Sequence, residues 1–122
     1  MRFLVVDDSS TMRRIIINTL TKLGYKECHE AGNGREGFDK LATTPVDMVI
    51  TDWNMPEMSG IEFIRAIRGN DATKTLPILM VTTNAAQDDI VEAMKAGVNN
   101  YVVKPFTPDT IKEKIEAALN AA

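Results

Sequence analysis

The chain has 122 residues, of which 44% are hydrophobic and 25% charged, and its formal net charge is −3. This composition is typical of one globular domain with its own core and excludes a disordered or fibrous chain. The acidic balance argues against non-specific binding along nucleic acid, and no apolar run is long enough to cross a membrane. The single cysteine, Cys28, cannot form an internal disulfide, and one Cys-His pair cannot complete a structural zinc site. Because no cleavage signal follows the N-terminal residues, we expect a cytoplasmic protein. We also expect it to be a monomer.

Five predicted strands alternate with five helical patterns. Apolar runs predict strands at residues 3–6, 48–51, 78–81 and 101–103, and a weaker signal predicts one at about 27–31, before the turn at Asn33-Gly34. The first helical pattern follows a cap at Ser9 or Ser10 and ends at Gly24. Its apolar side consists of Met12, Ile15, Ile16, Thr19, Leu20 and Leu23, and its solvated side of Arg13, Arg14, Asn18 and Lys22. Later helices are marked by Phe38 and Leu41, by Ile61 to Ile67, by Ile90 and Met94, and by a start at Thr107-Pro108.

This alternation predicts right-handed crossovers onto a parallel sheet. Five strands are too few for an eight-stranded barrel, so an open α/β sheet with helices on both faces is the remaining solution. We find no internal repeat and no linker-like segment, and we expect residues 1–122 to form a single domain.

Polar side chains follow four of the predicted strands. Asp7 and Asp8 come after the first strand, Asp52 after the third, Thr82 after the fourth and Lys104 after the fifth. Each has an ordinary structural explanation as a cap, a turn residue or a solvated strand end. Because ligands bind beyond the carboxyl ends of parallel strands, however, all five are expected at one edge of the sheet. Three carboxylates against one ammonium leave excess negative charge, which an oxygen-bound Mg²⁺ would offset.

A phosphoryl group matches this set of side chains. Mg²⁺, the Lys104 ammonium and the Thr82 hydroxyl would each contact one of its oxygens. No serine or cysteine nucleophile stands beside a base, so a carboxylate is the available covalent acceptor. Asp52, on a central strand, is the candidate, and Asp7 and Asp8 would lie on the metal side.

Four segments carry a family resemblance. They are Val5-Val6-Asp7-Asp8-Ser9, Thr51-Asp52-Trp53-Asn54-Met55-Pro56, Val81-Thr82 and Tyr101-Val102-Val103-Lys104-Pro105-Phe106. In this order and spacing they resemble a response-regulator receiver domain, and most closely the single-domain receivers of chemotaxis. The resemblance implies a flavodoxin-like, doubly wound, five-stranded parallel sheet in the order 2-1-3-4-5 with five helices.

The resemblance also implies roles for individual residues. Asp52 would be the phosphoacceptor, and Asp8, Asp52 and the main-chain carbonyl of Asn54 would bind Mg²⁺, with Asp7 acting on the metal through a water. Lys104 would contact the phosphoryl group, and the Lys104-Pro105 peptide bond would be cis. Thr82 and Tyr101 would form the switch, as the hydroxyl moves toward the phosphoryl group and the ring turns inward.

Partners follow from the same resemblance. A histidine kinase of the chemotaxis pathway would donate the phosphoryl group, the flagellar motor switch protein would receive the active form, and a phosphatase is a further candidate. A docking surface is expected at Ile90, Tyr101, Val103, Phe106 and Lys114. The protein's own catalysis would be confined to its phosphotransfer and dephosphorylation.

Other functions stay open at this point. One is a receiver that relays phosphate in another two-component pathway, and another is a Mg²⁺-dependent phosphohydrolase with an aspartyl-phosphate intermediate. A flavin or nucleotide carrier is disfavoured, because Asp7-Asp8 stands where such proteins need a neutral phosphate loop. Thr83 and Asn84 depart from the familiar chemotaxis pattern at the entrance to the site, and we expect Asn84 to admit water there.

Overall fold

A computed structural model describes residues 1–121 as five strands and five helices in strict alternation. The elements are β1 (Arg2–Val6), α1 (Ser10–Lys22), β2 (Glu27–Ala31), α2 (Gly34–Thr43), β3 (Met48–Thr51), α3 (Gly60–Arg68), β4 (Ile78–Thr82), α4 (Gln87–Ala96), β5 (Asn100–Val103) and α5 (Pro108–Ala121). All neighbouring strands pair in parallel, in the order β2-β1-β3-β4-β5. The predicted flavodoxin-like, doubly wound fold is therefore confirmed.

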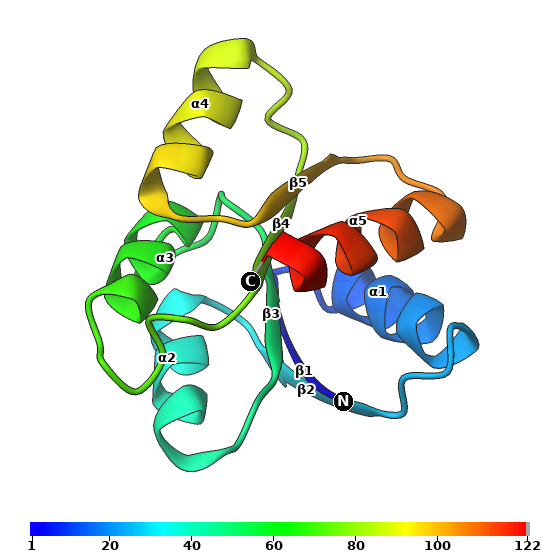
Figure 1. Cartoon of the computed structure of the whole chain (residues 1–122), viewed down its shortest axis with the longest axis horizontal. Coiled ribbons are helices and arrows are strands. Elements are labelled where there is room, and N and C mark those ends of the chain that lie inside the picture. The colour runs from blue at the N-terminus through cyan, green and yellow to red at the C-terminus, as the bar shows by residue number, and fades with distance from the viewer. Residues whose placement is uncertain (122) are drawn as a thin grey trace.

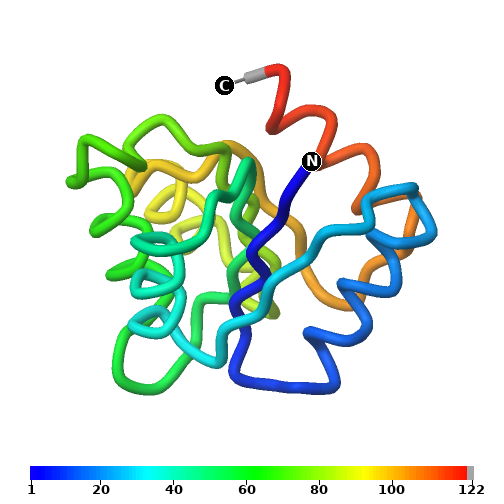
Figure 2. Tube along the Cα trace, turned by 90° about the horizontal axis from the view of Figure 1, so that it is seen from below, coloured from blue at the N-terminus to red at the C-terminus, as the bar shows by residue number. Residues whose placement is uncertain are grey.

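Helices cover the sheet on both faces (Figure 1). Helices α1 and α5 lie on one face and α2, α3 and α4 on the other, a division that Figure 2 shows from below. Side chains alternate between the two layers along each strand, as the pleat requires. In β1, Phe3 and Val5 pack in the core under α1 and α5, whereas Leu4 and Val6 pack under the other three helices. The inner strands β1, β3 and β4 are therefore apolar on both faces, which explains why they appear as continuous hydrophobic runs in the sequence, whereas the edge strand β2 keeps exposed glutamates.

The helix boundaries follow their capping residues. The Ser9 hydroxyl accepts a hydrogen bond from the Met12 amide, and Gly24 follows α1 with φ 99°, so both predicted ends of this helix are confirmed. Thr107 accepts a hydrogen bond from the Thr110 amide at the start of α5. The connections thus leave the short loops after β1, β3, β4 and β5 at one edge of the sheet.

Small boundary differences arise from tertiary pairing. Strand β1 starts one residue early, at Arg2, whose guanidinium binds Asp47, and β4 continues to Thr82 because Thr82 pairs with β5. Ile15 was predicted to lie on the buried, apolar side of α1, and this prediction was wrong, since its side chain is 44% exposed. Ile15 lies about 100° around the helix from the fully buried Ile16, which puts it beyond the arc that faces the sheet.

Candidate functional site

Three aspartates meet at the carboxyl edge of the sheet. Asp7 and Asp8 follow β1 and Asp52 follows β3, and these two strands are neighbours. One carboxylate oxygen of each residue lies within 4.8 Å of the others. Asp7 and Asp52 are buried, whereas Asp8 is exposed, so the cluster opens to solvent on the Asp8 side. The predicted acidic pocket is formed.

Lys104 binds two of these carboxylates. Its Nζ donates hydrogen bonds to Asp7 Oδ2 at 3.0 Å and to Asp52 Oδ2 at 3.1 Å, and only 12% of its side chain is exposed. Burial by itself lowers the pKa of Lys104, but the hydrogen bonds and charges of Asp7 and Asp52 outweigh it and raise that pKa. The ammonium is therefore held in its charged form between the two acids. The peptide bond from Lys104 to Pro105 is cis, as the resemblance implied.

The cluster still carries uncompensated negative charge. Burial raises the pKa of Asp7, even though the Ser9 amide and Lys104 both donate hydrogen bonds to its carboxylate. Three acids facing one ammonium are an unfavourable set in the absence of a cation. A hard divalent ion with oxygen ligands, such as Mg²⁺, fits this donor set, because it needs one or two carboxylates and keeps waters on the exposed side.

The loop after β3 is closed tightly around Asp52. The Trp53 amide donates to Asp52 Oδ1 at 2.6 Å, and the Gly60 amide donates to the Trp53 carbonyl at 2.7 Å. A Cβ atom at Gly60 would lie 2.1 Å from the Asp52 carbonyl oxygen. Only glycine therefore lets α3 begin this close to the strand end, a requirement that cannot be read from the sequence because it arises from the close approach of the Asp52 carbonyl.

Thr82 and Tyr101 are joined through the loop between β4 and α4. The buried Thr82 hydroxyl accepts a hydrogen bond from the Asn84 amide at 3.3 Å, and the Tyr101 hydroxyl donates to the Asn84 carbonyl at 2.5 Å. The Asn84 side chain accepts a further hydrogen bond from Asn54 Nδ2 at 3.1 Å. Asn84 thus connects the two expected switch residues with the β3–α3 loop. The amino-acid sequence did not indicate these contacts.

Tyr101 is turned inward. It is 9% exposed, and burial, with the charges of Asp89 and Asp52, raises the pKa of its phenol to about 12. In this conformation Tyr101 adds little to the expected docking surface. Val103 in β5 is exposed and Phe106 is half-buried.

Strand β5 is an edge strand of the sheet, with α4 and α5 on its two sides (Figure 1). Ile90 packs with the α2–α4 layer, whereas Phe106 packs with the α1–α5 layer, and Lys114 is half-buried on α5. Val91 and Met94 of α4 are also exposed, which the sequence analysis did not anticipate. Exposed apolar side chains therefore lie on α4 as well as on β5.

Arg13 does not lie on a fully solvated face as predicted. Its guanidinium donates to the main-chain carbonyl of Asp7 at 2.5 Å and its Nε to Glu30 at 2.9 Å, and its side chain is 19% exposed. Arg13 therefore supports the chain at the end of β1. The prediction failed because the helix pattern gives no sign of these partners, which lie just after β1 and in β2. Arg14, Asn18 and Lys22 are exposed as expected.

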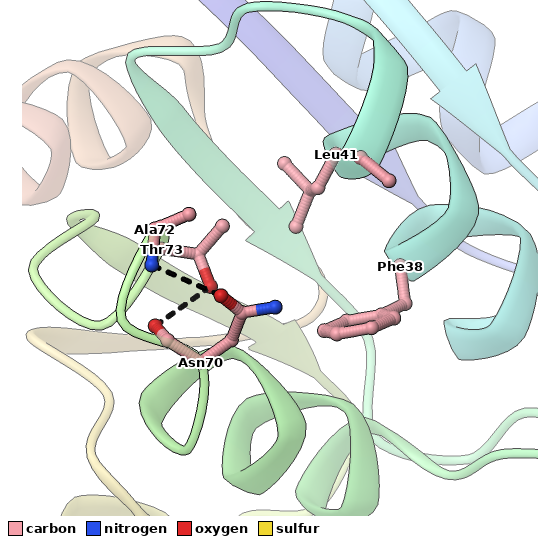
Figure 3. Close-up of a pocket in the computed structure, with 6 residues that line it drawn as sticks. Phe38, Leu41, Asn70, Ala72 and Thr73 are labelled. Atoms are coloured by element: carbon pink, nitrogen blue, oxygen red, sulfur yellow. Dashed lines mark hydrogen bonds between the residues drawn. The ribbon is translucent and has the colours of Figure 1, made fainter.

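A cavity of about 110 Å³ lies away from the acidic cluster (Figure 3). Its lining residues are Phe38, Leu41, Ala42, Asn70, Ala72 and Thr73. They come from the end of α2 and the connection that precedes β4, at the opposite edge of the sheet from the aspartates. The cavity and the acidic cluster therefore form no common site. Among the helices of residues 1–121, none combines the length and hydrophobicity needed to cross a membrane.

Comparisons with known proteins show which family the whole chain resembles. Residues 3–116 match the family model described as "Response regulator receiver domain". Among curated proteins, the chain is 52% identical to the chemotaxis protein CheY1 of Helicobacter pylori over 98% of this chain and 97% of that protein. It is 53% identical to the chemotaxis protein CheY of Pseudomonas aeruginosa, with 95% of this chain and 94% of that protein covered.

Solved structures give the same result. The crystallized chemotaxis protein CheY4 of Vibrio cholerae superposes with a TM-score of 0.89 at 37% identity, covering 96% of this chain and 97% of that chain. A putative response regulator from Chloroflexus aurantiacus superposes with a TM-score of 0.92 at 30% identity, covering 98% and 97% of the two chains.

Proposed function

The chain belongs to the response-regulator receiver family, and from that premise we propose that it is a phosphorylation-activated response regulator of chemotaxis. The observation that supports the proposal best is the contact of Lys104 Nζ with both Asp7 and Asp52 at the open edge of the sheet. This arrangement combines an acidic cation site, a carboxylate nucleophile and an ammonium for phosphoryl oxygens in one pocket.

Asp7, Asp8, Asp52 and the main-chain carbonyl of Asn54 would hold Mg²⁺. The ion would supply positive charge against the phosphoryl oxygens as negative charge develops on them. Asp8 is the exposed member of the acidic cluster and therefore leaves room on its side for waters and for the incoming phosphodonor.

Asp52 is the proposed phosphoacceptor. One of its carboxylate oxygens attacks the phosphorus of a phosphohistidine on the kinase, so that a P–O bond forms as the P–N bond breaks. The imidazole nitrogen leaves with the bonding electron pair and takes up a proton. In the later hydrolysis, a water oxygen bonds to phosphorus, the bond to Asp52 breaks, and inorganic phosphate and the free carboxylate result. Lys104 stays beside the transferred group throughout and binds one of its oxygens.

Thr82 and Tyr101 would transmit the change. The Thr82 hydroxyl would release the Asn84 amide and bind a phosphoryl oxygen, which alters the loop that also holds the Tyr101 hydroxyl. Phosphorylation would thereby favour one arrangement of α4 and β5 over another, because it interacts differently with the two. The surface formed by Ile90, Val103, Phe106 and Lys114, with the Tyr101 ring turned inward beside it, would then dock on the flagellar motor switch protein.

Phosphorylation is tested directly by intact mass. With Mg²⁺ and a small acyl phosphate donor, wild type should gain one phosphoryl group, whereas Asp52→Asn should gain none. Asp39→Asn is the matched control, because Asp39 is exposed on α2 and is not one of the clustered aspartates. The half-buried Trp53, adjacent to Asp52, should report Mg²⁺ binding by a change in fluorescence. A phosphoryl group on Asp52→Asn would contradict the assignment.

Docking is tested separately by pull-down with purified motor switch protein. We expect phosphorylated wild type to be retained more strongly than the unphosphorylated protein or Asp52→Asn. Equal retention of all three would contradict the chemotaxis output but leave the phosphorylation chemistry intact.

A further inference from the structure

Arg68, the last residue of α3, uses all of its donors on oxygen atoms. Its Nε and Nη2 donate to the Gly97 carbonyl at 3.0 and 2.7 Å, and Nη2 also donates to Asn99 Oδ1 at 2.9 Å. Its Nη1 donates to the carbonyls of Lys74 and Leu76 at 3.0 and 2.6 Å. One guanidinium therefore ties together the end of α3, the α3–β4 connection and the α4–β5 turn.

The charge of this guanidinium is balanced by helix ends. Within residues 1–121, no carboxylate forms an ion pair with Arg68, and partial burial lowers its pKa. Arg68 lies at the carboxyl end of α3 and binds the carbonyl of Gly97, the C-cap residue of α4. Both helix ends carry partial negative charge, so a cation placed between them stabilises both.

The contact between Arg68 and Gly97 requires a glycine at position 97. It has φ 118°, and a Cβ atom there would lie 2.9 Å from both Cγ and Nε of Arg68. The left-handed turn after α4 and the position of the guanidinium therefore depend on the same glycine.

The opposite end of α4 is held much less firmly. Ala86, the N-cap residue, provides no side-chain hydrogen bond, and favourable charge there comes only from Asp88 and Asp89. Ala93 is the only buried residue of α4, and both Val91 and Met94 are exposed. The helix therefore has one well-anchored end and one weakly anchored end.

We infer that Arg68 is a positioning residue that anchors the carboxyl end of α4, so that movement of this helix is confined to its amino-terminal half. That half follows the Asn84 loop, to which Thr82 and Tyr101 are bonded. The anchor itself is a property of the unphosphorylated protein. Its consequence for signalling, that α4 pivots about the Arg68–Gly97 contact, rests on the proposed function.

Amide hydrogen exchange of the unphosphorylated full chain tests the anchor. In Arg68→Ala, amides near the end of α4, including Gly97 and Val98, should exchange at least about tenfold faster relative to the β1 amides, because hydrogen bonds from a charged donor are lost. Arg68→Lys keeps the positive charge but loses the planar arrangement of guanidinium donors. It should give a smaller increase in the exchange rate of the same amides. Arg65→Ala, on the exposed side of the same helix, is the matched control and should change neither group.

Two outcomes would overturn the inference. One is unchanged exchange at the end of α4, and the other is an equal acceleration of α4 and β1 amides, which would make Arg68 a general stabiliser. If Arg68→Ala does not fold, the same comparison is made with Arg68→Lys.

A double-mutant cycle provides a second measurement. Gly97→Ala should lower the unfolding midpoint more in wild type than in the Arg68→Ala background, because the clash with Arg68 is then absent. Equal losses in both backgrounds would contradict the anchor. Neither measurement involves phosphate, so a failure of the proposed function, seen as no phosphorylation of Asp52, would be recognised separately.

Discussion

The Tyr101 hydroxyl donates a hydrogen bond of 2.5 Å to the main-chain carbonyl of Asn84, while the Asn84 amide donates to the Thr82 hydroxyl. One loop residue therefore binds both members of the expected switch through its main chain. Because the two contacts use backbone groups, a side-chain change at Asn84 leaves the chemical groups of both contacts in place. The Asn84 side chain takes part in neither contact, so we expect a substitution there to act on the access of water to Asp52.

The phenol of Tyr101 should titrate late. Its pKa is raised to about 12, mainly by burial and further by Asp89 and Asp52. A raised folded-state pKa stabilises the protein fully below the ordinary value of 10.0, and this contribution is lost as pH rises toward about 12. Tyrosinate absorbance should show a step near pH 12 that Tyr101→Phe removes. If Tyr101→Phe instead removed an absorbance step near pH 10, the assignment of a buried, hydrogen-bonded phenol to Tyr101 would be contradicted.

Removing the Asp7 charge should stabilise the protein when divalent ions are absent. Burial raises the pKa of Asp7, so ionisation of this carboxyl reduces folding stability as pH rises through the folded pKa. At neutral pH in a chelator, Asp7→Asn should raise the thermal midpoint by a few degrees, of the order expected for about 1 kcal/mol. Added Mg²⁺ should then raise the midpoint of wild type but much less that of Asp7→Asn. A lower midpoint for Asp7→Asn in chelator would contradict this account.

Gly60 should not tolerate a side chain. A Cβ atom there would lie 2.1 Å from the Asp52 carbonyl, so Gly60→Ala must displace the end of β3 or the start of α3. We expect a loss of about 1–3 kcal/mol in the free energy of unfolding, as for other overpacked sites. Phosphorylation of Asp52 should also be impaired. Chemical denaturation measures the first effect. Gly69→Ala at the other end of α3, where the added Cβ atom would lie 3.2 Å from the Arg65 carbonyl oxygen, should lose less stability.

Asn84 should control hydrolysis of the phosphorylated form. The residue is half-buried, and its side chain accepts a hydrogen bond from Asn54 across the loops that border the acidic cluster. A longer, charged side chain in Asn84→Glu should restrict the approach of water and slow the decay of the acyl phosphate several-fold. Phosphate release after removal of the donor measures the decay. Ala85→Glu adds the same charge at an exposed neighbour and should have little effect, whereas an unchanged rate in Asn84→Glu would refute the role of Asn84.

Much of the fold could be read from the amino-acid sequence because its signals are local. The predicted strands at 27–31 and 48–51 match β2 and β3 residue for residue, although only the second is a fully buried run, and Ser9, Gly24 and Thr107 mark helix ends through their own capping chemistry. The order of the sheet was taken from the family resemblance. Once strands were assigned, the position of Asp7, Asp8, Asp52 and Lys104 at strand ends was sufficient to predict a shared pocket, because parallel strands end at one edge.

Other features depended on contacts between distant segments. Ile15 fits the apolar pattern of its helix, yet only the way α1 rests on the sheet decides that it faces solvent. Arg13 and Arg68 appear in the sequence as ordinary helix-surface cations, but their hydrogen-bond partners are main-chain carbonyls and side chains brought near by folding. Periodicity and capping act over a few residues, and they determined the elements and the edge of the sheet at which the aspartates gather. Which polar group each side chain meets is decided by how those elements pack, and that is visible only in three dimensions.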